Sequence, residues 1–489
     1  MKKRILVFES WHRSPQFETG LEISELHALE GDEVTYINIG GKLPFLEWHK
    51  IEKSGILKKL YTYSYNYKIG QAKKLIHPSV KIIKEDKLSD ADKEVLKTEY
   101  SFLDIEDLKG FERNGIEIGM AAASSLISMT NDLSPDTVKY KELINSIIHS
   151  SIIVAITFER YLEEIKPDLV YFRNGRVAVY RPVLRLCQQK GIEFRVHDRG
   201  SNKFRYSVGN NIRHSFEMIN DQIHQAWNDA DPLEKYGIAE QYYNERRQGK
   251  ELSWKSFVKG QIIGILPEGW DNSKYNIVFF TSSMAEYAAV SSGINLNILF
   301  TSQPTAVLEI AEYLSAFPDI HFYVRLHPNL LNQSDNEKNI WSAMKHPSIR
   351  FIYPDSEVST YTLIDQSNII MSYRSMVSIE ASFAEKPSII LSRAWYEQLN
   401  AVYIPKDKAE LFEMLTSKTL QAKPQQGSSM FGYYMKTFGI DHKLYSPNDL
   451  HSGSFKGVDL QIEPWVSRFY KFNRKLLIRV YRKIRTFIS

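Results

Sequence analysis

Short apolar runs separated by segments of helical spacing give this chain the rhythm of an α/β protein. The first run covers residues 5–8, a helix-like segment follows at 21–29, and a second run covers 34–37. Continuous apolar runs of this length are typical of parallel strands that are buried on both faces. The opening of the chain therefore predicts a strand–helix–strand unit with parallel strands.

The same rhythm returns later in the chain. Runs at 168–172 and 193–197 flank a helix predicted at 181–189. Further strands are predicted at 277–280, 321–324, 350–353, 369–371 and 388–391, with helices at 305–317, 359–366 and 375–384. We therefore predict an α/β protein with two Rossmann-like, doubly wound domains that face a cleft.

Polar stretches between these runs indicate where the domains begin and end. We expect an N-terminal domain over residues 1–255 with a mainly helical insertion at about 43–160, a C-terminal domain over 256–445, and a tail over 446–489. Open α/β sheets bind ligands beyond the carboxyl ends of their strands. The residues that directly follow each strand are therefore the candidates for chemistry.

The composition is that of a folded globular protein, with 489 residues of which 43% are hydrophobic and 25% charged. The single cysteine, Cys187, excludes an internal disulfide and a cysteine metal cluster, which favours a reducing compartment. No stretch approaches about 18 uninterrupted apolar residues, and the first apolar run ends at Phe8. We therefore expect a cytoplasmic protein without a transmembrane helix or a signal peptide.

The formal charge of +4 is unevenly distributed. The last 22 residues hold eight lysines and arginines and no acidic residue, which leaves the other 467 residues with a formal charge of −4. Nucleic-acid binding normally needs a basic face on the folded domain itself. This mildly acidic body therefore argues against a nucleic-acid partner.

His12 and Glu18 follow the first predicted strand. An imidazole with an ordinary pKa of about 6.5 accepts a proton at neutral pH, so both residues are candidates for proton transfer. In the alternative interpretation, His12 packs a loop and Glu18 complements the N-terminus of a helix.

Two arginine-rich segments follow the later strands of the N-terminal half. Arg173, Asn174 and Arg176 end one strand, and Asp198 and Arg199 end the next. Guanidinium groups bind phosphates or acidic sugars through paired hydrogen bonds, and a buried aspartate with a raised pKa acts as a general base. The alternative is a network of carboxylate–guanidinium pairs that fixes these loops.

Hydroxyl, cationic and imidazole side chains end the strands of the C-terminal half. Thr281 and Ser282 follow its first strand, as phosphate ligands or simply as turn formers. Arg325 and His327 alternate toward one side of the next strand end, and Pro328 stops that strand. A cation beside an imidazole suits a phosphate ester, whereas in the structural alternative His327 hydrogen-bonds the backbone.

The strongest local pattern is a strand that runs into a serine-rich turn and a helix at residues 371–381. Ser372 and Ser375 are expected to offer hydroxyl and amide donors to a phosphate at the start of this helix, and Glu380 to reach the ribose hydroxyls of a nucleotide. In the alternative, Ser375 is a helix N-cap.

These motifs carry a resemblance to a known family. The segment Arg325-Leu326-His327-Pro328, followed by the serine turn and helix with Glu380-Ala381, resembles the nucleotide-binding half of GT-B glycosyltransferases of bacterial capsule and surface-polysaccharide synthesis. That group is similar in these motifs to sialyl-, Kdo- and glycerophosphate transferases that use cytidine-nucleotide donors. Segments 172–176 and 197–200 are similar to other capsule-synthesis proteins, in which a glutamate often stands at the position of Asp198.

The resemblance implies roles for individual residues. His327 and Pro328 match the histidine–proline motif that holds the donor phosphate, Ser372 or Ser375 matches the serine motif beside it, and Glu380 matches the acidic residue that binds ribose. The acidic-acidic-glycine base motif of the bacterial sialyltransferases has no clear equivalent in this chain.

Together these observations predict a GT-B glycosyltransferase. It would move a sugar from a nucleotide-sugar donor, CMP- or UDP-activated, to a bacterial surface polysaccharide or lipid-linked glycan. Two alternatives stay open: a nucleotide-sugar 2-epimerase, which needs no acceptor, and a non-catalytic subunit of a polysaccharide assembly complex. The Asp-x-Asp triplets at 90–92 and 229–231 follow no predicted strand, so we expect no obligatory metal and no cofactor.

The basic tail predicts a membrane contact. Its apolar residues recur at three- or four-residue intervals, which gathers them on one stripe of a helix. The residues expected at the membrane are Trp465, Phe469, Lys471, Arg474, Lys475, Arg482 and Lys483. Basic, aromatic amphipathic helices bind anionic surfaces, so we expect peripheral attachment to the inner face of the bacterial cytoplasmic membrane. Alternatively, this helix packs back on the N-terminal domain.

Overall fold

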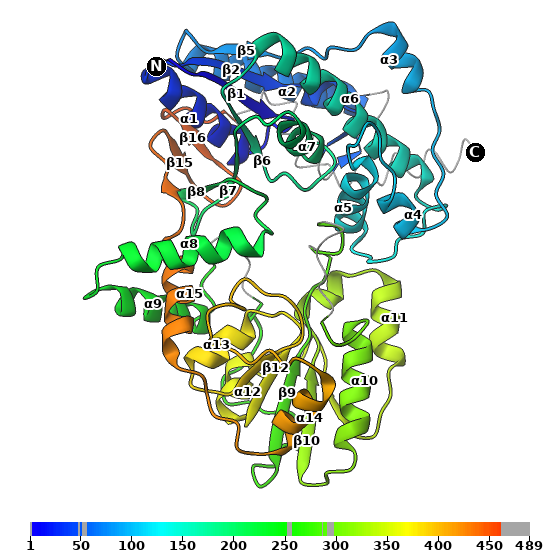
Figure 1. Ribbon diagram of the computed structural model, residues 1–489, viewed down its shortest axis with the longest axis vertical. Coiled ribbons are helices and arrows are strands. Elements are labelled where there is room, and N and C mark those ends of the chain that lie inside the picture. Colours follow the sequence, from blue (N-terminus) through cyan, green and yellow to red (C-terminus); the bar gives the residue numbers. More distant parts are fainter. Residues whose placement is uncertain are drawn as a thin grey trace.

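The computed structural model describes residues 2–46, 49–50, 56–251, 257–285, 287–290 and 298–460, without the side chains of 49–50 and 56–60. They form two lobes, each built on its own sheet (Figure 1). The predicted tail helix, with Trp465, Phe469, Lys471, Arg474, Lys475, Arg482 and Lys483, lies outside the described residues.

The N-terminal lobe contains a seven-stranded sheet in the order β14-β8-β7-β6-β1-β2-β5. Its strands are β1 (Arg4–Glu9), β2 (Glu33–Asn38), β5 (Lys81–Ile83), β6 (Leu169–Arg173), β7 (Phe194–Arg199), β8 (Arg205–Gly209) and β14 (Ile440–Asp441). The five strands from β7 to β5 are parallel, and β8 and β14 are antiparallel additions at one edge. The apolar positions of β1 are fully buried, as its continuous apolar run predicts.

Helices α1 (Gln16–Leu29) and α7 (Arg181–Gln189) lie in the two predicted crossovers of this lobe. The insertion between β2 and β6 holds most of its other helices: η1 (Gly40–Lys42), α2 (Ile56–Leu75), α3 (Asp90–Val95), α4 (Ile105–Lys109), α5 (Ile118–Thr130) and α6 (Lys141–Ile165). It also holds β5 and the short hairpin of β3 (Phe45–Leu46) and β4 (His49–Lys50). The prediction of a mainly helical insertion did not include β5, which is only three residues long.

No transmembrane helix is predicted from the sequence. By its length and composition alone, helix α6 could cross a membrane. However, 67% of its most apolar window is buried inside the protein. Ile147, Ile148 and Ile152 are fully buried in the core of the N-terminal lobe. This is the pattern of a core helix in a globular domain.

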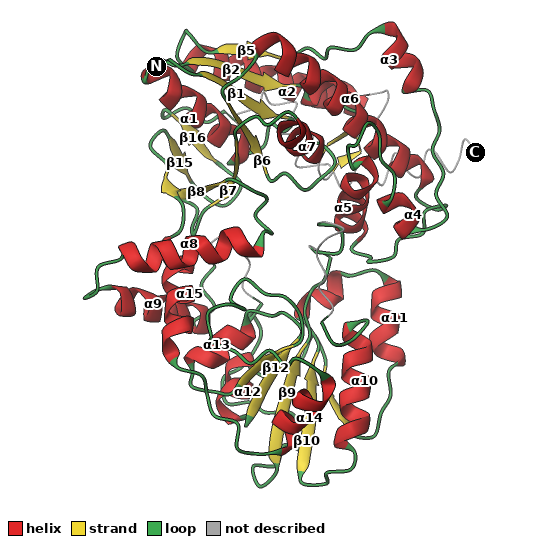
Figure 2. Ribbon diagram, in the orientation of Figure 1, coloured by secondary structure: helices red, strands yellow, loops and turns green. Residues whose placement is uncertain are grey.

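The C-terminal lobe contains five parallel strands in the order β11-β10-β9-β12-β13. They are β9 (Tyr275–Phe280), β10 (Ile320–Arg325), β11 (Ile349–Ile352), β12 (Ile369–Ser372) and β13 (Ser388–Ile390). The accompanying helices are α10 (Gln303–Leu314), η2 (Pro328–Asn332), α11 (Asp335–Ala343), α12 (Thr360–Gln366), α13 (Val377–Phe383) and α14 (Lys408–Thr416) (Figure 2).

The two parallel sheets have the same topology. Counted along each lobe, the strands follow the order 3-2-1-4-5 of a Rossmann-like half. The predicted α/β class with two doubly wound domains is therefore confirmed, in the arrangement of the GT-B fold. In such sheets the ligand site lies where the strand order reverses, between β1 and β6 in one lobe and between β9 and β12 in the other.

The boundary between the lobes differs from the predicted one at residue 255. Helices α8 (Phe216–Asp229) and α9 (Lys235–Arg247) share a hydrophobic core with α13 and with α15 (Gln425–Thr437). Figure 1 shows α15 beside α8 and α9, and α13 lies between α15 and the C-terminal sheet. By packing, the C-terminal lobe therefore begins near residue 215, because the apolar faces of α8 and α9 are buried there.

The chain then returns to the N-terminal lobe through β14, which pairs with β8, and the hairpin of β15 (Tyr445–Pro447) and β16 (Gly453–Phe455). Glu22 on α1 anchors this return. Its carboxylate accepts the backbone N–H groups of Lys443 at 2.7 Å and Tyr445 at 3.0 Å, and lies 3.2 Å from Nδ1 of His442. These contacts satisfy a carboxylate that is fully buried.

A second connection joins the lobes away from these helices. Ala289 and Val290, on the segment after β9, are buried in the hydrophobic core of the N-terminal lobe. The Val290 carbonyl accepts Nη1 of Arg181 at 2.6 Å. The described residues between β9 and this anchor therefore connect the two lobes.

Candidate active site

A cavity of about 330 Å³ lies at the point in the C-terminal lobe where the strand order reverses. Seven of the eight residues predicted to bind the donor line it, namely Thr281, Ser282, Arg325, His327, Pro328, Ser375 and Glu380. They come from the ends of β9, β10 and β12 and from α13, which the parallel sheet brings to one edge. We call this cavity the donor pocket.

His327 is held as a neutral hydrogen-bond donor. Its Nδ1 accepts the backbone N–H of Asn329 at 3.1 Å, so the ring proton of the neutral form lies on Nε2. Burial, assisted by the nearby Arg325, lowers the pKa of His327 to about 4. At neutral pH this side chain therefore offers one N–H group and no charge.

The hydroxyl groups of the donor pocket are also arranged as donors. The oxygens of Thr281 and Ser282 accept the backbone N–H groups of His327 at 2.7 Å and Arg374 at 3.0 Å. Ser375 Oγ accepts the N–H of Val377 at 3.3 Å. A hydroxyl that accepts one bond keeps its own proton to donate, so these groups suit a ligand rich in acceptor oxygens.

Ser372 differs from the other predicted donor ligands. It is fully buried and does not line the pocket; its Oγ lies 2.7 Å from Oγ of Ser378 and accepts the N–H of Ser375 at 3.0 Å. Ser372 therefore orients the turn that carries Ser375. The following helix, α13, has only seven residues, so the hydroxyls rather than the end of a long helix supply the donors.

Arg325 is a buried cation that has no carboxylate within hydrogen-bond distance in the described part of the chain. Its Nη1 donates to the carbonyl of Tyr353 at 3.0 Å and its Nη2 to that of Ser356 at 3.3 Å, while Nε has no hydrogen-bond partner among the described residues. Burial lowers its pKa to about 10, so it stays charged at neutral pH. A buried N–H without a partner costs free energy unless a ligand satisfies it.

Glu380 lines the pocket as an ion pair. Its Oε1 accepts Nε of Arg246 on α9 at 3.1 Å, and this carboxylate raises the pKa of the guanidinium. Tyr242 and Tyr361 line the same part of the pocket. The predicted ribose contact of Glu380 would therefore be made by a carboxylate that already has a cationic partner.

Several lining residues were not predicted from the sequence. Arg374 lies with its guanidinium carbon 3.2 Å from the ring centre of Tyr287, and the Tyr287 ring packs edge-on at 5.0 Å from that of His214. Trp395 also lines the pocket. Arg374 stands within the serine-rich segment, directly before Ser375, so the sequence pattern could have identified it, whereas the other residues meet only through the tertiary fold.

A second cavity of about 470 Å³ adjoins the donor pocket, and we call it the interdomain cavity. Its lining includes four of the predicted N-terminal residues, Arg173, Asn174, Arg176 and Arg199, as well as Asp198. Ser283, Asn329 and Trp395 line both cavities. The residues predicted for donor and acceptor thus face spaces that share a wall.

Asp198 is ionised in this cavity. Burial by itself raises the pKa of a carboxyl, but Arg173, Arg213, the N–H of Arg199 and the amide of Asn174 outweigh it, so the pKa of Asp198 is lowered. The N–H of Arg199 lies 2.8 Å from Oδ1, and Nδ2 of Asn174 lies 3.3 Å from Oδ2. The expectation of a raised pKa is wrong, because burial brings cations as well as low polarity.

His12 and Glu18, the other proton-transfer candidates, line neither cavity. The His12 ring packs edge-on against Tyr61 and Tyr65 at 5.3 and 5.8 Å. Glu18 is fully buried, 2.7 Å from Nζ of Lys68 and from Oγ of Ser14. The structure thus places these two side chains in contacts within the N-terminal lobe.

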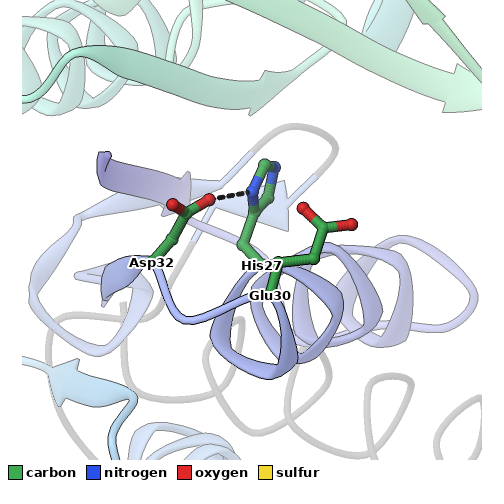
Figure 3. A group of neighbouring side chains, drawn as sticks. All are labelled: His27, Glu30 and Asp32. Carbon is green, nitrogen blue, oxygen red and sulfur yellow. Dashed lines mark hydrogen bonds and ion pairs between the residues drawn. The ribbon is translucent and has the colours of Figure 1, made fainter. Parts of the chain in front are cut away.

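One group of side chains in the described part of the chain has the spacing of metal ligands: His27, Glu30 and Asp32 (Figure 3). Its histidine is already used, because Nδ1 lies 2.8 Å from Asp32 and Nε2 lies 3.1 Å from the hydroxyl of Tyr171. This group lies at the end of α1 and lines neither cavity. Its contacts are explained by the turn between α1 and β2.

Comparisons with known proteins give distant structural likenesses. No protein-family model matches the chain, and no curated protein sequence matches it. A β-Kdo 2,4-transferase, KpsC of Thermosulfurimonas dismutans, is similar at 13% identity over 55% of this chain and 79% of that one, with a TM-score of 0.37. The UDP-GlcNAc 2-epimerase of Neisseria meningitidis, bound to UDP-GlcNAc, is similar at 13% identity over 90% and 95%, with a TM-score of 0.28. At these TM-scores neither likeness assigns a substrate or a residue role to this chain. Such assignments rest on the geometry of the chain itself.

Proposed function

We propose that this protein is a glycosyltransferase that moves a sugar from a nucleotide-sugar donor to a glycan acceptor of the bacterial surface. The observation that carries the proposal is the pair of adjoining cavities at the reversal point of the C-terminal sheet and between the lobes. A transferase needs two substrates side by side, and the shared wall of Ser283, Asn329 and Trp395 supports such a meeting point.

In this proposal the donor phosphate lies against the hydroxyls of Thr281, Ser282 and Ser375 and against Nε2–H of His327. Arg325 and Arg374 stabilise the negative charge that develops as the bond between the sugar carbon and the phosphate oxygen breaks. The nucleotide leaves with the electron pair of that bond. Donor groups held in place by the backbone do this without reorganisation, so the proposal includes no metal ion.

The acceptor hydroxyl enters through the interdomain cavity, where Asp198 takes its proton as the new glycosidic bond forms. Asp198 is ready to accept a proton because it is ionised, although its lowered pKa makes it a weak base. If the reaction retains configuration, the same carboxylate would attack the sugar carbon instead. Residues of both lobes line this cavity, so the bound substrates would be enclosed and water would be excluded from the donor.

A nucleotide-sugar 2-epimerase is the second candidate, because a pocket lined by hydroxyl, imidazole and arginine donors would also suit its nucleotide substrate. The interdomain cavity favours the transferase, since an epimerase needs no acceptor. Incubation of the protein with UDP-N-acetylglucosamine alone separates the two: a rearranged sugar would support the epimerase. We further propose that the protein works at the inner face of the cytoplasmic membrane, where a lipid-linked acceptor would be available.

Calorimetric titration of the full chain with CMP, UDP and GDP tests the proposal. We expect one nucleotide to bind in the donor pocket and the others to bind more weakly. The result also identifies the donor. Absence of binding by all three would contradict a transferase and favour a non-catalytic subunit.

A further inference from the structure

Trp395 lies on the wall shared by the donor pocket and the interdomain cavity. The other described residues that line both spaces are Ser283 and Asn329, so Trp395 supplies the aromatic surface of this wall. It follows β13, the edge strand of the C-terminal sheet. A group that passes from a donor in one cavity to an acceptor in the other must lie against this wall.

The loop that carries Trp395 is fixed on both sides of it. The guanidinium of Arg393 forms an ion pair with Glu397 at 2.6 Å, and this pair spans the loop. The Tyr396 hydroxyl donates to the carbonyl of Ser375, in the serine-rich turn of the donor pocket. The position of the indole is therefore tied to the turn at which the donor phosphate is expected.

The indole of Trp395 offers ring surface rather than a polar group. It is partly exposed, packs against the hydrophobic core of α8, α9, α13 and α15, and has the guanidinium of Arg213 at 5.5 Å from its ring centre. Its Nε1 is buried and has no hydrogen-bond acceptor among the described residues. An unsatisfied N–H costs free energy, so hydrogen bonding does not explain why a tryptophan stands here. What remains is the ring surface that borders both cavities.

The chemistry of this wall suits a sugar ring. A pyranose carries C–H groups on its faces and hydroxyl groups around its edge, so its faces suit an aromatic ring and its edge suits hydrogen-bonding groups. Nδ2 of Asn329 donates to Oγ of Ser283 at 3.5 Å, which leaves the hydroxyl its own proton to donate to a ligand. The wall thus combines an apolar platform with neutral polar groups beside it.

We infer that Trp395 is the platform for the sugar that is transferred, with the pyranose ring packed on the indole and its hydroxyls beside Ser283 and Asn329. The nucleotide of the same donor occupies the donor pocket, and the acceptor enters from the interdomain cavity. The reacting sugar carbon then lies where the two spaces meet. Trp395 is therefore a specificity-determining residue for the sugar and not for the nucleotide. This inference rests on the proposed function.

Paired ligands with and without a sugar test the inference on the full chain. The pairs are UDP with UDP-N-acetylglucosamine, CMP with CMP-N-acetylneuraminate, and GDP with GDP-mannose, titrated by calorimetry into the unmodified protein and into Trp395→Ala. Each of these sugars is a pyranose, so each presents a ring face to the indole. For the nucleotide that binds, we expect Trp395→Ala to weaken the nucleotide-sugar about tenfold and the free nucleotide less than about twofold.

A conservative variant and a second tryptophan sharpen the test. Trp395→Phe keeps an aromatic ring and removes an N–H that has no acceptor, so it should restore part of the affinity for the nucleotide-sugar. Trp270→Ala is the matched control, because Trp270 lies in the same lobe, donates from Nε1 to Asn272 at 2.9 Å and lines neither cavity. It should leave the affinities for both members of the pair unchanged. Unchanged affinity for the free nucleotide shows that the donor pocket of each variant is folded.

Equal losses for nucleotide and nucleotide-sugar in Trp395→Ala would overturn the inference, because the residue would then act on the whole pocket. Unchanged affinity for both ligands, or an equal loss in the Trp270 control, would also overturn it. Failure of the unmodified protein to bind any of these ligands would contradict the proposed function instead, so the two failures are distinguishable.

Discussion

The donor pocket and the interdomain cavity share a wall but differ in the chemical groups that line them. The donor pocket presents hydroxyls, a neutral imidazole and aromatic rings, and one of its cations, Arg246, is paired with Glu380. The part of the interdomain cavity that the structure describes is lined by four guanidinium groups and one carboxylate. Hydrogen-bond donors fixed by the backbone recognise the shape of a phosphate group, whereas clustered charge recognises an anion of any shape.

This difference predicts that added salt and amino-acid substitutions affect binding at the two cavities differently. Charge-based binding weakens as salt is added, while binding through neutral donors is less sensitive. Substitutions in the donor pocket should change nucleotide affinity, and substitutions in the interdomain cavity should change turnover or acceptor binding. Four experiments test this division, beginning with the one that has the largest expected effect.

Replacing Asp198 by asparagine removes the one carboxylate among the described residues of the interdomain cavity. We expect turnover to fall by about 10²–10⁴-fold, because a general base contributes on this scale. Nucleotide affinity, measured by calorimetry, should stay within about twofold since Asp198 does not line the donor pocket. Loss of nucleotide binding in this variant would instead reverse the roles of the two cavities.

Replacing Val290 by alanine tests whether the segment that separates the two cavities is anchored in the N-terminal lobe. Val290 is 1% exposed, so the loss of its two methyl groups should lower the free energy of unfolding by about 1–3 kcal/mol. Urea denaturation measures the change. Val138→Ala is the control, because Val138 is 79% exposed and its substitution should have little effect. Equal stability of both variants would contradict the anchor.

Replacing His327 by alanine removes the Nε2–H donor of the donor pocket. Nucleotide affinity should fall about tenfold, the size expected for a lost hydrogen bond to a charged group. His346→Ala is a matched control, since His346 lies in the same lobe, 3.1 Å from Glu312, and does not line the pocket. An effect of equal size in the control would point to general destabilisation.

The dependence of nucleotide affinity on pH should be the smallest effect. The pKa of His327 is lowered to about 4, so its side chain keeps the same neutral state from pH 8 down to pH 6. Affinity should therefore change by less than about twofold over this range, apart from ionisation of the nucleotide itself. A steep increase on acidification would mean that an imidazolium ion binds the phosphate.

The same lowered pKa has a consequence for stability. A histidine with a pKa of about 6.5 in the unfolded chain and about 4 in the folded protein binds its proton first in the unfolded state. Its contribution is complete above pH 6.5 and is lost as the pH falls toward 4. The unfolding free energy of His327→Gln should therefore decline less between pH 7 and pH 5 than that of the unmodified protein.

Much of the fold could be predicted from local pattern. The apolar runs at 5–8, 34–37 and 277–280 lie within β1, β2 and β9, because a strand buried on both faces must be apolar throughout. The short strands β5 and β14 were not predicted, because segments of three and two residues are too short to show the hydrophobic pattern of a strand. The packing of α8 and α9 on the C-terminal lobe also has no local signal.

The sequence by itself determined the order of the longer apolar strands in each lobe, and with it the residues that follow each of them. Parallel topology brings these residues to one edge, which is why Thr281, His327 and Ser375 lie in one pocket. Only the tertiary structure decided the charge states and the contacts between lobes. The lowered pKa of Asp198 depends on Arg173 and Arg213, and the shared wall of the two cavities depends on Trp395. Electrostatic fields and cavities arise from distances through space, and a chain read residue by residue does not contain those distances.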